Sequence, residues 1–153
     1  SKGQRKRCSN RQRSPKVFGQ IVRVVFDSNI FISALVFPGS QAEDAVTRVL
    51  EGVDTLILSK AILDEVLITL GRKFSRDPEA LSQTAVLLSE MAAVVNPTRT
   101  VSIFKDDPDN RILECAEAGQ AECIVTGDKA MLQLKEYQGI RLISLRDYLI
   151  SGL

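Results

Sequence analysis

Short apolar runs alternate with longer amphipathic stretches through most of the chain. The runs are rich in β-branched residues and too short for helices, so they predict buried strands at residues 21–26, 55–58, 93–95, 123–126 and 140–144. The stretches between them have apolar residues at helical spacing and predict helices beginning near residues 29, 41, 59, 77, 109, 128 and 145. This alternation predicts an α/β fold, with a parallel sheet covered by helices on both faces.

Residues with capping chemistry indicate where several of these helices begin. Ser59 is a natural N-cap directly after the second predicted strand. Asp77 combines a capping side chain with a proline at the next position, which is a strong helix start. Asp109 can cap the helix that ends near Gly119, and Asp128 opens the following helix.

The first 20 residues differ in composition from the rest of the chain. Residues 1–20 contain seven Lys/Arg and no acid, and they are predicted to form a flexible tail ahead of one domain at residues 21–153. The favoured interpretation is a disordered extension, and the alternative is a basic arm that binds nucleic-acid phosphates. The remaining residues carry 13 Lys/Arg against 19 Asp/Glu, a balance of −6.

Composition excludes several classes of protein. Of the 153 residues, 44% are hydrophobic and 25% are charged, which is typical of one globular domain, and neither a membrane span nor a secretory signal is found. Three cysteines without framework spacing predict free thiols in a reducing cytoplasm. The chain has no histidine, which excludes Ser-His-Asp and Cys-His hydrolysis and the HExxH metalloproteases.

Four acidic residues lie where strands give way to helices, or within helices that begin there: Asp27, Glu65, Asp109 and Asp128. Taken singly, an acid at a helix N-terminus is most simply a cap, and Glu65 is no better a candidate than the neighbouring Asp64. Ligands of parallel α/β sheets bind beyond the carboxyl ends of the strands, so the four acids are expected to meet there. Carboxylates that share one site repel one another, and a hard divalent cation relieves that repulsion. Such a cation can support phosphodiester hydrolysis without histidine.

Three blocks of sequence resemble those of PIN-domain ribonucleases: residues 24–35, 107–116 and 124–129. The likeness extends over about residues 22–150 and is closest to the toxin components of bacterial and archaeal toxin–antitoxin systems. The resemblance implies a three-layer α/β/α sandwich around a central parallel sheet, with cleavage of RNA, expected to be single-stranded, that depends on Mg²⁺ or Mn²⁺. It also implies a homodimer and a small cognate antitoxin.

The resemblance also assigns roles to individual residues. The four acidic positions of the family, which bind the metal and carry catalysis, match Asp27, Glu65, Asp109 and Asp128. Two supporting polar positions match Asn29 and Thr126, which are expected to orient the carboxylates. Asp107 is a further acid near the site, interpreted as a turn residue before Pro108. Six cations are candidates to line a path for RNA phosphates: Arg72, Lys73, Arg76, Lys105, Arg111 and Lys129.

Other functions remain as alternatives to a nuclease. A PIN-like module with weak catalysis could act as a binding or regulatory partner, and metal-dependent turnover would distinguish it. A phosphoacceptor receiver domain expects paired acids after the first strand, where Asp27 stands alone. A haloacid-dehalogenase-type hydrolase expects Asp-x-Asp there, but Asn29 occupies the second position. No Gly-rich phosphate loop of the GxxxxGK[ST] type occurs.

Overall fold

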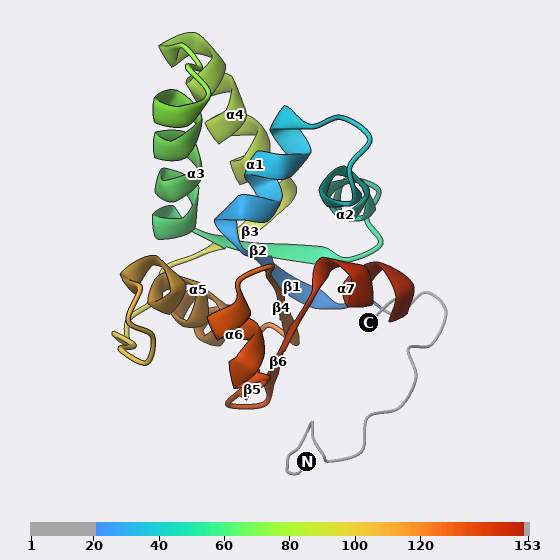
Figure 1. Cartoon of the computed structure of the whole chain (residues 1–153), viewed down its shortest axis with the longest axis vertical. Coiled ribbons are helices and arrows are strands. Elements are labelled where there is room, and N and C mark those ends of the chain that lie inside the picture. The colour runs from blue at the N-terminus through green and yellow to red at the C-terminus, as the bar shows by residue number, and fades with distance from the viewer. Residues whose placement is uncertain (1–20, 152–153) are drawn as a thin grey trace.

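The computed structural model describes residues 21–151, so the tail predicted at residues 1–20 lies outside the described residues (Figure 1). Strands form where apolar runs were found at β1 (Arg23–Phe26), β2 (Thr55–Ser59), β3 (Ala92–Val95), β4 (Cys123–Val125) and β6 (Ile140–Ile143), and a further short strand is β5 (Glu136–Tyr137). Helices occupy most of the amphipathic stretches: α1 (Ser28–Val36), α2 (Gln41–Leu50), α3 (Lys60–Lys73), α4 (Pro78–Met91), α5 (Asp107–Ala118), α6 (Lys129–Leu134) and α7 (Leu145–Ser151). None of the helices between residues 21 and 151 is long and apolar enough to cross a membrane.

The strands form a single sheet in the order β3-β2-β1-β4-β6-β5. All neighbours pair in parallel except β5, which runs antiparallel to β6. The predicted parallel sheet is therefore confirmed for five strands. The sequence analysis missed β5 because it has only two residues. A tight turn makes it possible, since Gln138 and Gly139 both adopt positive φ angles, of 50° and 82°.

Alternate side chains of β1 point to two different layers of helices. The Phe26 ring packs against Phe31 of α1 and Tyr148 of α7, with ring centroids 5.7 and 5.8 Å apart. Val25 points to the opposite face, together with Ile57, its register partner on β2. That second face is covered by α5, which packs on β1, β2 and β4. Figure 1 shows α1 to α4 on one side of β2 and α5 on the other, so the α/β/α sandwich is confirmed.

Besides Asp128, the N-cap of α6, two predicted helix caps are present in the structure. The Ser59 hydroxyl accepts a hydrogen bond from the Ile62 amide at 3.4 Å and starts α3. The Asp77 carboxylate accepts one from the Ala80 amide at 2.8 Å and starts α4. Both caps satisfy amide groups that have no partner within the helix, so these boundaries follow directly from the sequence.

The predicted cap of α5 was wrong. The helix begins at Asp107 and its N-cap is Asp106, whose side chain makes no capping hydrogen bond. Asp109 therefore lies inside the first turn. Pro108 explains the earlier start, because a proline is tolerated in the first turn, where its missing N–H would have no partner.

We predict that Gly119→Ala destabilises the fold. An added Cβ would clash with Cγ2 of Ile57, at the point where the end of α5 meets β2. Overpacking of this kind costs about 1–3 kcal/mol, which thermal or urea unfolding would detect. Gly127→Ala is the matched control, since its Cβ would meet nothing within 4 Å and its φ is not positive. Equal stabilities of the two variants would contradict this account of the α5–β2 contact.

Candidate active site

The carboxyl ends of β1 and β4 lie side by side near the middle of the sheet. These two strands pair in parallel, with Phe26 opposite Val125. From β1 the chain proceeds to β2 and β3 on one side, whereas β4, β6 and β5 lie on the other. A reversal of this kind leaves a crevice beyond the strand ends, which is where ligands of open α/β sheets bind. Asp27 follows β1 and Thr126 follows β4, so both lie at this crevice.

Asp27 is a buried carboxylate, 5% exposed, and it is held from three directions. It is the N-cap of α1, and its Oδ1 accepts hydrogen bonds from the Asn29 amide at 3.2 Å and the Ser28 hydroxyl at 3.4 Å. Its Oδ2 accepts a bond from the Thr126 hydroxyl at 2.7 Å. Asn29 thus contacts Asp27 through its backbone, and its side chain is exposed. Thr126 is the side chain that orients this carboxylate.

The Thr126 hydroxyl also positions the next acid. It accepts a hydrogen bond from the Asp128 amide at 3.0 Å, and Thr126 itself is fully buried. Asp128 is the N-cap of α6, and its Oδ1 accepts a bond from the Met131 amide at 3.0 Å. One hydroxyl group therefore joins the acid after β1 to the acid after β4.

Asp109 is the acid that the fold does not neutralise. It is 7% exposed, yet its carboxylate makes no hydrogen bond with any residue between 21 and 151. Burial, together with the negative charges of Asp128, Asp106 and Asp27, raises the pKa of Asp109 to about 7. The structure thus brings Asp27, Asp109 and Asp128 within electrostatic reach of one another. It adds Asp106, which the sequence analysis missed although it lies in an acidic run.

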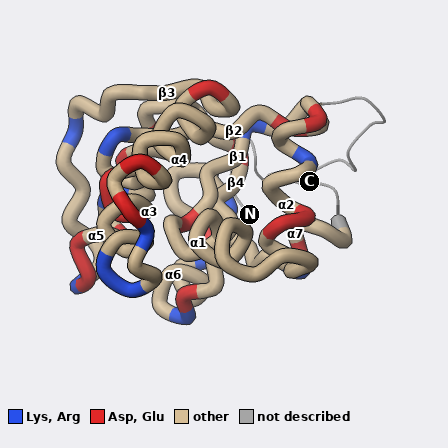
Figure 2. Tube along the Cα trace, turned by 90° about the horizontal axis from the view of Figure 1, so that it is seen from above, with Lys and Arg blue, Asp and Glu red and all other residues tan. Residues whose placement is uncertain are grey.

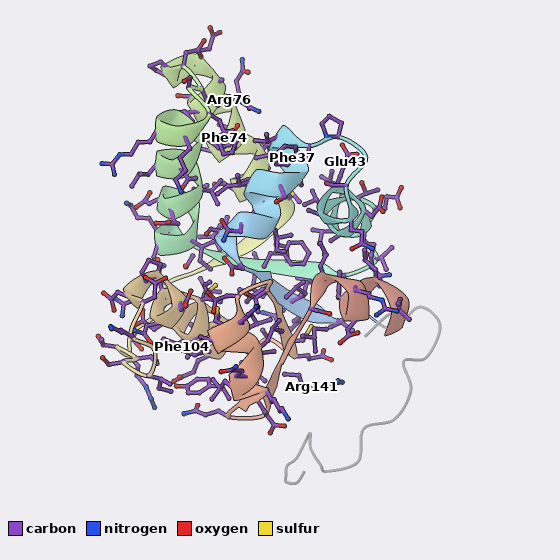
Figure 3. The ribbon with its side chains drawn as sticks, in the orientation of Figure 1. Phe37, Glu43, Phe74, Arg76, Phe104 and Arg141 are labelled. Atoms are coloured by element: carbon purple, nitrogen blue, oxygen red, sulfur yellow. The ribbon has the colours of Figure 1, made fainter. Side chains whose placement is uncertain are left out.

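A buried amide fixes the loop that leads into α5. The Asn110 side chain, 1% exposed, accepts hydrogen bonds from the amides of Ile103 and Phe104 at 3.0 and 2.7 Å. It also donates to the Phe104 carbonyl at 2.9 Å and to Asp107 at 3.2 Å. Figure 3 labels Phe104 beside α5. Asn110 therefore holds the segment that carries Asp106 and Asp107, a role that the sequence pattern did not predict.

Glu65 lies on α3 and is not among the acids whose charges raise the pKa of Asp109. It lines a pocket that also includes Ser28, the hydroxyl partner of Asp27. Its neighbour Asp64 instead forms an exposed ion pair with Lys60 at 2.7 Å. The structure therefore separates two residues that the sequence pattern alone could not distinguish. In Figure 2, acidic positions on α3, on α5 and beside α6 lie along one side of the molecule, interspersed with basic ones.

The chemistry of these donors fits a hard divalent cation. All four candidate ligands are carboxylates, and oxygen ligands are preferred by Mg²⁺ and Mn²⁺ rather than by softer metals. A cation beside Asp109 would offset the repulsion that raises its pKa. Within residues 21–151, no three acidic or cysteine side chains are grouped closely enough to form a metal site by themselves. Metal binding, and the assignment of the four acids as its ligands, therefore stay predictions.

We predict that Asp109 makes the metal-free protein less stable as the pH rises. Its pKa is about 7 in the folded protein, against about 3.9 in an unfolded chain. Between these values the folded state binds more protons than the unfolded state. The contribution of Asp109 to the free energy of unfolding is therefore fully present below about pH 4 and is lost as the pH rises through 7.

Thermal melts in EDTA across this pH range would test the effect. Asp109→Asn should flatten the decline and raise the melting temperature at neutral pH. Asp147→Asn is a matched control, because it is also a first-turn aspartate but is exposed. An unchanged slope in Asp109→Asn would assign the titration to another group.

Comparisons with known proteins bear on the fold and the family of this chain. The chain is 27% identical over 119 residues to the uncharacterized protein MJ1680 of Methanocaldococcus jannaschii, covering 75% of this chain and 76% of that one. This chain shares its fold with VapBC2 from Rickettsia felis, whose structure was solved bound to a DNA fragment from their promoter. The TM-score is 0.57 and the sequence identity is 14%. That match covers 80% of this chain and 98% of the other.

VapBC-1 from nontypeable Haemophilus influenzae has the same fold, with a TM-score of 0.57 and 18% identity. The match covers 81% of this chain and 98% of that one. At these identities the two solved structures establish the fold alone. The family model for the PIN domain matches residues 23–130, which include all four candidate acids. The chain belongs to the PIN domain family.

Proposed function

We propose that this protein is a divalent-metal-dependent endoribonuclease that hydrolyses phosphodiester bonds in single-stranded RNA. The observation that carries the proposal is Asp109, a buried carboxylate without a hydrogen bond, whose pKa is raised by burial and by two other candidate ligands. Membership of the PIN domain family, whose members are generally nucleases, supports it. The absence of histidine from the sequence supports it as well, because metal-assisted hydrolysis is one route that needs no imidazole.

In this proposal the chain supplies ligands and holds them in place. Asp27, Glu65, Asp109 and Asp128 would hold Mg²⁺ or Mn²⁺. When bound, such an ion supplies an activated water and charge stabilisation for the leaving oxygen. Thr126 fixes the orientations of Asp27 and the Asp128 backbone through its hydroxyl, as outer-shell residues do in metal sites.

The proposed biological role is that of a toxin in a toxin–antitoxin pair. It rests on the sequence resemblance, and the shared fold with VapBC2 and VapBC-1 supports it. A small cognate antitoxin and a second copy of the chain are the partners that this role implies. We also propose a cytoplasmic location. It rests on the three cysteines without framework spacing, which predict free thiols in a reducing compartment.

A second candidate is a PIN-like binding or regulatory module with weak catalysis. Two observations favour it: the described acids do not form a closed metal site, and residues 21–153 carry 13 basic against 19 acidic residues, which repels RNA. The two candidates differ in one measurable property, which is turnover of RNA in the presence of added metal.

We predict that purified protein cleaves single-stranded RNA in Mn²⁺ or Mg²⁺ and that EDTA abolishes cleavage. Glu65→Gln should lower kcat/KM by about 100-fold or more, because loss of a metal ligand exceeds the 10- to 100-fold effect of outer-shell changes. Asp64→Asn is the control on the same helix and should retain wild-type activity, since Asp64 pairs with Lys60 outside the pocket. Cleavage that persists in EDTA, or equal losses in both variants, would refute this assignment.

We predict that Thr126 acts as a positioning residue for Asp27 and Asp128. Thr126→Val keeps the shape of the side chain but removes both hydrogen bonds, so the affinity for Mn²⁺ should fall by about 10- to 100-fold. Thr126→Ser should restore it, because the hydroxyl returns. Mn²⁺ titrations on all three proteins give the comparison. A merely structural role would instead lower the melting temperature while leaving the metal affinity unchanged.

A further inference from the structure

A pocket of about 230 Å³ lies between α3 and α5, next to the group of acids. These two helices contact each other beyond the sheet edge, where the N-terminal end of α3 lies above α5 (Figure 1). Ser28 and Glu65 place the pocket beside the proposed metal ligands, because Ser28 donates to Asp27. An RNA held for cleavage at the acids would therefore have a neighbouring nucleotide at this pocket.

The two facing walls of the pocket are apolar. Ala61 and Ile62 come from α3, and Pro108 and Ile112 come from α5. A nucleobase is flat and has apolar faces, so such walls can cover both of its sides. A phosphate group has no apolar surface and would leave the walls in contact with water.

Charge also favours an uncharged ligand. Glu65 and Asp107 contribute two carboxylates to the lining and Arg111 contributes one guanidinium, so these charges sum to −1. The single guanidinium is already paired with two carboxylates, Asp107 and Glu114, so it does not favour a phosphate. A base is neutral, and its N–H groups can donate to a carboxylate.

Asp107 and Arg111 form an ion pair in which each side chain still has an atom free to form a hydrogen bond with a ligand. Asp107 Oδ1 accepts from Asn110 at 3.2 Å and from Arg111 at 3.4 Å, which leaves Oδ2 without a partner among the described residues. All contacts of the Arg111 guanidinium are made by Nη2, to Asp107, to the Val101 carbonyl at 3.2 Å and to Glu114 at 2.9 Å. Its Nη1 has no partner among the described residues and is the donor left for a ligand, whereas its Nε is unpaired but buried. The pair thus offers an acceptor next to a donor.

We propose, on the basis of the proposed ribonuclease function, that this pocket binds the nucleobase next to the cleaved phosphodiester and that Asp107 and Arg111 select guanine. Guanine is the base whose pairing edge has two adjacent donors, N1–H and N2–H, beside the O6 acceptor. Asp107 Oδ2 accepts from these donors, and Arg111 donates to O6, the atom that arginine most often recognises in guanine. The other three bases each form fewer of these bonds.

Cleavage of four oligouridylates tests the selection. One contains only uridine, and the others carry a single guanosine, adenosine or cytidine at the same internal position. The full-length wild-type chain with Mn²⁺ should cleave next to guanosine with a kcat/KM about tenfold above the other three. Asp107→Asn should reduce this ratio towards one, because a neutral amide oxygen accepts the two guanine donors more weakly than a carboxylate oxygen does. Asp64→Asn should keep the wild-type ratio, since Asp64 lies outside the pocket.

A binding experiment separates this proposal from the proposed nuclease function. Fluorescence anisotropy with the same four RNAs and the Asp27→Asn protein needs no turnover. A guanosine preference in binding without any cleavage by the wild type would support the pocket and refute the nuclease. Cleavage with equal rates and equal affinities for the four RNAs would overturn the pocket and leave the nuclease intact. A preference for another base, or an equal loss on all four RNAs in Asp107→Asn, would also overturn the assignment.

Discussion

The Thr126 hydroxyl is the contact on which the geometry of the site depends. It donates a hydrogen bond to the carboxylate of Asp27 and accepts one from the amide of Asp128. Thr126 is fully buried, so its hydroxyl acts as both donor and acceptor away from water. The parallel register of β1 and β4 makes this possible, because Phe26 and Val125 are partners and the next residues along the two strands are Asp27 and Thr126. A serine or threonine hydroxyl is small enough to fit between two strand ends and still has both a donor and an acceptor. The separation of Asp27 and Asp128 is thus determined by backbone pairing in the sheet.

The two remaining candidate ligands come from opposite layers of helices. Glu65 is on α3, which packs with α1 on one face of the sheet, and Asp109 is on α5, which covers the other face. Helices on opposite faces can touch only where the sheet ends. The contact between α3 and α5 therefore lies beyond the strand ends, and the pocket between them adjoins the crevice where Asp27 and Thr126 lie. The proposed metal ligands and the proposed nucleobase pocket consequently lie at the same edge of the sheet, beyond the carboxyl ends of the strands.

The sequence predicted the parts of this arrangement that depend on local pattern. Apolar runs and caps such as Ser59 and Asp77 located most strands and helices, and strand ends located Asp27 and Asp128. Features that depend on contacts between distant segments were not predictable. The short strand β5 exists because it pairs with β6, and Asn110 is important because the loop before α5 folds over it. Likewise, only the fold shows that Glu65 faces the pocket while Asp64 pairs with Lys60.

Two adjacent residues of α5 show why Asp109 is better explained by function than by stability. Asn110 is 1% exposed and its amide makes four hydrogen bonds, so its burial costs little and it fixes the loop. Asp109 is 7% exposed and its carboxylate makes none with the described residues, while burial and neighbouring acids raise its pKa to about 7. One turn of α5 thus holds a buried side chain, Asn110, whose polar atoms are all hydrogen-bonded, beside Asp109, whose carboxylate is not hydrogen-bonded by the described residues. A buried charge without a partner lowers the stability of the protein alone, and its presence is explained if a cation completes the site.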